Sequence, residues 1–101
     1  MSEASATRTV TVINSQGLHA RAAVLLAELV RRFQAKVELI AKDRRRVAPT
    51  DVLQTLSLGA VQGEELLLVA TGDDAQAALD AVADLFARKF DEDSETQKQE
   101  P

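Results

Sequence analysis

One short segment determines how this chain folds: Asn14-Ser15-Gln16-Gly17-Leu18-His19-Ala20-Arg21. The residues before it are mostly β-branched and alternate between two faces, which predicts a strand. In the residues after it, apolar side chains recur every three or four positions, which predicts a helix. Gly17 can adopt the positive φ that a sharp turn between a strand and a helix often requires.

His19 falls at or beside the first position of this predicted helix, where backbone N–H groups have no partner within the helix. These N–H groups and the positive end of the helix dipole attract anions. Arg21 follows closely, and a guanidinium makes charge-assisted, forked hydrogen bonds to phosphoryl oxygens. A neutral imidazole is a nucleophile, so the segment predicts a phosphoryl group carried on His19. The residues alone leave open a structural histidine and a solvated surface arginine.

The composition is that of one small globular domain. The 101 residues include no cysteine and one histidine, which excludes disulfides and argues against a zinc site, so we expect no metal. No glycine-rich nucleotide-binding motif occurs, and we expect no cofactor. The net charge of −4 argues against nucleic acid as a partner. No apolar run reaches the roughly 18 residues of a membrane span, and residues 1–7 lack a signal-peptide core, so we expect a cytoplasmic protein without a membrane partner.

The order of the predicted elements is β-α-β-β-α-β-α, within a single domain at residues 7–90. Strands are expected at 7–13, 36–42, 45–48 and 64–71, and helices at 19–33, 51–58 and 73–90. Residues 1–6 are expected to be a flexible tail, and residues 91–101, which are acidic and polar, a disordered one. This order predicts an α+β fold with a largely antiparallel sheet and its helices on one face.

Local patterns add finer expectations. Asp51, with Gln54 three residues later, resembles a capping box at the start of the second helix, with Thr50 as a competing N-cap. Arg31 and Arg32 are expected in the last turn of the first helix, and Asp73 or Asp74 as the cap of the third. The basic run 44–46 is expected to be solvated charge on a hairpin, the alternative being a patch for an acidic partner.

The second helix is unusually apolar for its length. Its two turns hold four apolar side chains, Val52, Leu53, Leu56 and Leu58. The core cannot cover all of them, so part of the helix should remain exposed. An exposed apolar surface beside a chemical site indicates a place where a protein partner docks.

Three segments resemble the HPr phosphocarrier proteins of the phosphoenolpyruvate-dependent sugar phosphotransferase system. They are residues 17–23, residues 56–63 and residues 72–74, and the resemblance extends over about residues 8–88. It implies an open-faced β-sandwich, with four antiparallel strands covered on one face by three helices.

The resemblance also implies the function and its residues. His19 would accept a phosphoryl group at Nδ1 from phosphorylated Enzyme I and pass it to an EIIA-type acceptor domain, with Arg21 stabilising the phosphate. The chain would be a monomeric carrier and not an enzyme in the strict sense. The partner-binding positions implied are Leu18, Ala20, Val52, Leu53 and Leu56.

Two residues depart from the family pattern. Ala22 stands where the family usually has a proline, and alanine is also a good helix former, so the fold should survive. Asp51 stands where many relatives have a regulatory serine at the N-cap, which would remove that switch. A shift of one residue would instead make Thr50 the target of a regulatory kinase.

Two other functions compete with the carrier. An HPr-like module could regulate a kinase or transcription factor by docking alone, although such a module would not need His19. A small hydrolase or isomerase could use His19 as a general base, and it would turn over substrate without a partner.

Overall fold

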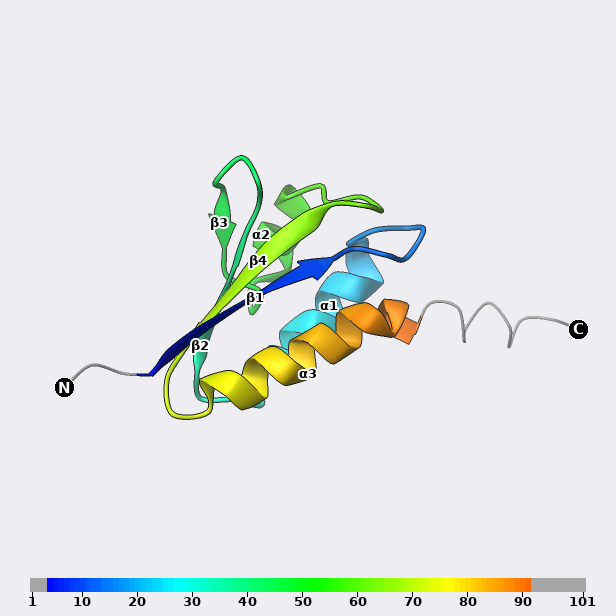
Figure 1. Cartoon of the computed structure of the whole chain (residues 1–101). Helices are drawn as coiled ribbons and strands as arrows, with labels where there is room; N and C mark the ends of the chain where they lie inside the picture. The colour runs from blue at the N-terminus through cyan, green and yellow to red at the C-terminus, as the bar shows by residue number, and fades with distance from the viewer. Residues whose placement is uncertain (1–3, 92–101) are drawn as a thin grey trace, which may run out of the picture.

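Four strands form one antiparallel sheet in the computed structural model of this chain, which describes residues 4–91 (Figure 1). The strands are β1 (Ser5–Thr11), β2 (Lys36–Ile40), β3 (Arg46–Val47) and β4 (Glu65–Thr71). Their spatial order is β1-β4-β2-β3, so β4 lies in the middle of the sheet although it comes last in the chain. The α+β fold with an antiparallel sheet is therefore confirmed.

Three helices cover one face of this sheet (Figure 1). They are α1 (Ala20–Val30), α2 (Val52–Ser57) and α3 (Ala75–Ala87), and a short 3₁₀ turn, Lys89–Asp91, follows α3. The alternation along each strand explains this layering, because every second side chain points toward the helices. The core side chains of the sheet are Val10, Val37, Leu39, Val47, Leu66, Leu68 and Ala70. The other face stays open, and Thr9, Leu67 and Ile40 lie side by side across it.

The start of the first strand and the end of the first helix differ from the prediction. The first strand begins at Ser5, because Ser5 and Ala6 pair with Thr71 and Ala70 of β4, so part of the predicted N-terminal tail belongs to the sheet. The first helix ends at Val30, and Arg31 is its C-cap, so neither Arg31 nor Arg32 lies in the last turn.

The third helix starts at Ala75, slightly later than predicted, and the expected side-chain cap is absent. Asp74 occupies the N-cap position, yet its carboxylate makes no capping bond to α3. It accepts hydrogen bonds from the backbone N–H groups of Gln34 (2.9 Å) and Ala35 (2.7 Å), in the loop that leads into β2. The aspartate therefore connects two parts of the chain that are far apart in sequence.

The third helix also ends earlier than predicted. It stops at Ala87, and Lys89, Phe90 and Asp91 all have positive φ values between 53° and 60°. This left-handed turn returns the Phe90 ring to the core, where it contacts Phe86 edge to face with 4.9 Å between ring centroids. The predicted acidic tail lies, beyond Asp91, outside the described residues.

The part of the chain that the structure describes, residues 4–91, has neither a membrane-spanning helix nor a cluster of metal ligands. No helix in this part of the chain is long and apolar enough to cross a membrane. Within the same residues, no group of three or more His, Asp or Glu side chains could hold a metal ion.

Candidate phosphoryl site and docking surface

The turn before α1 is built by backbone contacts with the loop after α2. Gly17 has a φ of +68°, as predicted, and a Cβ atom there would lie 2.5 Å from the carbonyl oxygen of Ala60. The next N–H group, of Leu18, donates to that same oxygen at 3.0 Å. Asn14 closes the turn from the other side, with its side-chain Nδ2 donating to the Gly17 carbonyl at 2.8 Å. The close approach of the two loops leaves room only for glycine.

His19 is the N-cap residue of α1, which confirms its predicted place at the helix start. Its backbone is extended and its carbonyl accepts the first bond of the helix, from the Ala23 N–H at 2.9 Å. The imidazole does not cap α1, since it makes no capping hydrogen bond to the helix N-terminus. The ring is half-buried, and its Nε2 atom is buried. The site thus presents an imidazole at the positive end of an 11-residue helix.

Arg21 is exposed in the first turn of α1 and follows His19 and Ala20 in the chain. The first turn carries no acidic residue, so no carboxylate of that turn opposes an anion there. The helix N-terminus, His19 and Arg21 therefore all belong to the same helical turn. This set can receive a phosphoryl group and hold its negative charge.

The short helix α2 presents the predicted exposed apolar surface. Leu53 is 77% exposed, and Val52 and Leu56 are half-buried, whereas Leu58 belongs to the core. Leu18 was expected to contact partners as well, but it is only 4% exposed. The turn that carries His19 directs Leu18 into the core, so Leu18 serves packing instead.

Val24 of α1 was missed as a candidate partner-binding residue. It is 42% exposed and follows Ala20, also exposed, by one helical turn. Arg31 continues the same stripe of α1, and its Nη2 donates to the Thr50 carbonyl just before α2, at 2.8 Å. This stripe therefore faces the α2 side of the molecule. An apolar residue off the buried stripe of a helix was the signal in the sequence.

Asp51 caps α2, and Thr50 does not. The Asp51 carboxylate accepts a hydrogen bond from the Gln54 N–H at 3.2 Å. The predicted capping box is only half formed, because the Gln54 side chain bonds to the Ala48 N–H (2.9 Å) and to the Asp51 carboxylate, not to the Asp51 N–H. The Asp51 N–H is already used, since it donates to the Ala48 carbonyl at 2.9 Å.

A family model described as "PTS HPr component phosphorylation site" matches residues 6–88. The chain belongs to the HPr family. An HPr phosphocarrier protein of Treponema pallidum is 40% identical over 86 residues, which cover 85% of this chain and 97% of that protein. An NPr phosphocarrier protein of Shewanella violacea is 42% identical over 87 residues, 86% of this chain and 94% of that protein. The crystal structure of an HPr from Thermoanaerobacter tengcongensis, at 34% identity, aligns with a TM-score of 0.79 over 84% of this chain and 94% of that one.

The structure describes the surroundings of the two residues that were expected to depart from the family pattern. Ala22 is fully buried inside α1, and the helix forms with alanine at this position, as expected. Asp51, and not Thr50, is the N-cap residue of α2. Its carboxylate already accepts the bond that a serine hydroxyl would accept.

Proposed function

We propose that this chain is a phosphocarrier that accepts a phosphoryl group on His19 from phosphorylated Enzyme I and passes it to an EIIA-type acceptor in the cytoplasm. The single observation that supports this most strongly is the place of His19 at the N-terminus of α1, with Arg21 in the same turn. The burial of Nε2 favours Nδ1 as the nitrogen that reacts.

In the proposed step the lone pair of Nδ1 forms a bond to phosphorus while the bond between phosphorus and the donor atom of Enzyme I breaks. The donor retains that electron pair, so no other reactant is needed. The positive end of α1 and the Arg21 guanidinium stabilise the negative charge on the transferring group. Transfer to the acceptor is the same exchange in reverse, which is why the chain is a carrier and not a catalyst.

Docking is assigned to the apolar surface that α1 and α2 form together. Ala20 and Val24 supply it from α1, and Val52, Leu53 and Leu56 from α2. The donor and the acceptor would use this surface in turn, because both must approach the same histidine. Thr50 is exposed beside α2, so a kinase that phosphorylates it would modify the edge of this surface.

The test is the intact mass of the chain after incubation with phosphoenolpyruvate and a cognate Enzyme I. We expect a single added phosphoryl group that is lost in acid and kept in base, as a phosphohistidine would be. The His19→Ala variant should gain no mass, and the Arg21→Ala variant should gain it at least tenfold more slowly, since one charged donor is removed. No added mass on the wild type, with an Enzyme I active on its own HPr, would refute the carrier.

A docking module is the second candidate, and the 77% exposure of Leu53 favours it independently of His19. In that case the wild type would bind a partner through α2 without becoming phosphorylated, and His19→Ala would bind equally well. The mass measurement therefore separates the two functions.

A further inference from the structure

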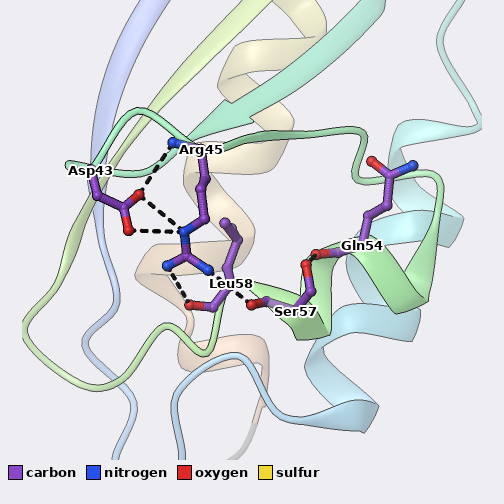
Figure 2. Close-up of polar contacts among 5 residues, drawn as sticks. All are labelled: Asp43, Arg45, Gln54, Ser57 and Leu58. Carbon is purple, nitrogen blue, oxygen red and sulfur yellow. Dashed lines mark hydrogen bonds and ion pairs between the residues drawn. The ribbon is translucent and has the colours of Figure 1, made fainter.

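The arginine Arg45 joins the β2–β3 hairpin to the C-terminal end of α2, as Figure 2 shows. Its Nη1 donates to the Ser57 carbonyl at 3.0 Å and its Nη2 to the Leu58 carbonyl at 3.2 Å. Asp43 holds the same guanidinium from the opposite side, accepting from Nε at 2.9 Å. All three nitrogens of the guanidinium therefore donate hydrogen bonds, Nε to Asp43 and the two Nη atoms to the C-terminal end of α2.

The shape of the hairpin delivers this arginine to α2. The Ala41 N–H donates to the Arg45 carbonyl (2.9 Å), and the Arg44 N–H donates to the Ala41 carbonyl (2.8 Å). Arg44 has a φ of +77°, the left-handed residue that often ends a three-residue hairpin loop. The turn places Asp43 and Arg45 close enough for their side chains to bond. The arginines of the basic run 44–46 therefore differ in their contacts: Arg45 reaches the end of α2, whereas Arg46 pairs with Glu38 within the hairpin.

A six-residue helix such as α2 depends on contacts of this kind. So short a helix is not stable alone, and its last carbonyl groups have no partner within the helix. The Ser57 hydroxyl donates to the Gln54 carbonyl at 2.6 Å, and Arg45 donates to the carbonyls of Ser57 and Leu58 (Figure 2). A cation also suits the negative end of the helix. At the other end, Arg31 binds the Thr50 carbonyl, so arginines from two elements hold α2 at both ends.

We infer that Arg45 is a positioning residue for the docking surface: it sets the orientation of α2, and with it the direction in which Leu53 is presented to a partner. This inference rests on the proposed carrier function. The guanidinium touches neither His19 nor the reacting atoms. Loss of Arg45 should therefore weaken encounter with Enzyme I without slowing the transfer step in the bound complex.

The experiment compares Arg45→Gln with Arg46→Gln, since both remove one positive charge from the same hairpin and only Arg45 contacts α2. The rate of phosphorylation by Enzyme I is measured against the concentration of the carrier. We expect Arg45→Gln to raise KM by about three- to tenfold with kcat unchanged, because a charged hydrogen bond at an exposed site has a modest net effect. Arg46→Gln should leave both constants at the wild-type values.

Amide hydrogen exchange tests whether the loss of Arg45 destabilises the C-terminal end of α2. Exchange should accelerate in residues 55–59 of Arg45→Gln and not in Arg46→Gln. Arg45→Lys should restore only part of the affinity, because an ammonium cannot span two carbonyl groups in one plane. In the Arg45→Gln and Leu53→Ala double variant the two increases in KM should combine less than additively, since both act through α2.

The outcomes separate this inference from the proposed function. A KM of Arg45→Gln equal to that of Arg46→Gln, with the wild type phosphorylated normally, overturns the role of Arg45 and leaves the carrier intact. A loss of kcat at unchanged KM overturns it as well, because Arg45 would then act on the transfer step. A wild type that gains no phosphoryl group overturns the proposed function and the docking role of Arg45 together.

Discussion

The tightest constraint on a single residue is at Gly17, where backbone conformation and packing both require glycine. A side chain there would adopt an unfavourable φ of +68° and meet the Ala60 carbonyl oxygen at 2.5 Å. We expect Gly17→Ala to lower the free energy of unfolding in urea by about 2–4 kcal/mol. Gly59→Ala is the matched control, because its φ is +60° and no atom lies within 4 Å of the added Cβ. Equal losses in the two variants would show that the approach of Ala60 contributes nothing.

Thr55 offers a prediction of the opposite sign. Its side chain is fully buried, and its hydroxyl makes no hydrogen bond within residues 4–91. Valine has nearly the same shape and no hydroxyl to desolvate, so Thr55→Val should raise the free energy of unfolding by about 1 kcal/mol. Thr50→Val, at an exposed position, should change it by less than about 0.5 kcal/mol. A destabilised Thr55→Val would mean that a buried water satisfies the hydroxyl.

At the scale of an element, the β2–β3 hairpin carries a titratable contact. Hydrogen bonds from the Arg45 side chain and backbone hold the pKa of Asp43 below its ordinary value of 3.8. A lowered pKa means that the folded state favours the carboxylate, so the contact stabilises the fold above pH 3.8 and is lost as the pH falls through the folded-state pKa. A titration of the Asp43 carboxyl carbon by NMR should show the lowered pKa in the wild type. The Arg45→Gln variant should move it back toward 3.8.

The existence of each helix and strand followed from the sequence, whereas several of their ends did not. Periodicity is a local property, and the apolar residues of β4 and α3 show it plainly. Element ends depend on partners distant in sequence, which no local pattern reveals. Ser5 joins β1 because Thr71 lies opposite, and Asp74 leaves its own helix uncapped because Gln34 and Ala35 are near.

In the candidate site, too, local features could be predicted and packing could not. His19 and Arg21 could be placed from sequence, because a glycine turn and a helix start are both local features. The burial of Leu18 could not, since it depends on how the turn before α1 packs on the Ala60 loop, nor could the exposure of Val24, which depends on how α1 packs on its neighbours. The link from Arg45 to α2 joins residues 12 and 13 positions apart, so it too is visible only in the fold.

At the scale of the whole molecule, the helices cover one face of the sheet, and the C-terminal turn closes the end of that layer (Figure 1). The three left-handed residues of the turn are strained, because each has a side chain and a positive φ. The turn buries the Phe90 ring, which packs edge to face on Phe86, and this burial offsets part of the strain.

Phe90 is therefore the residue by which the last turn stabilises the whole domain. We expect Phe90→Ala to lower the free energy of unfolding by about 3–5 kcal/mol, measured by urea denaturation. Phe90→Leu keeps most of the volume and should cost less than about 2 kcal/mol. A small loss in both variants would mean that the core is complete at Phe86 and that burial of Phe90 does not offset the strain. A large loss of stability in Phe90→Ala alone would show that the residues that unfold cooperatively extend beyond the end of α3, to Phe90.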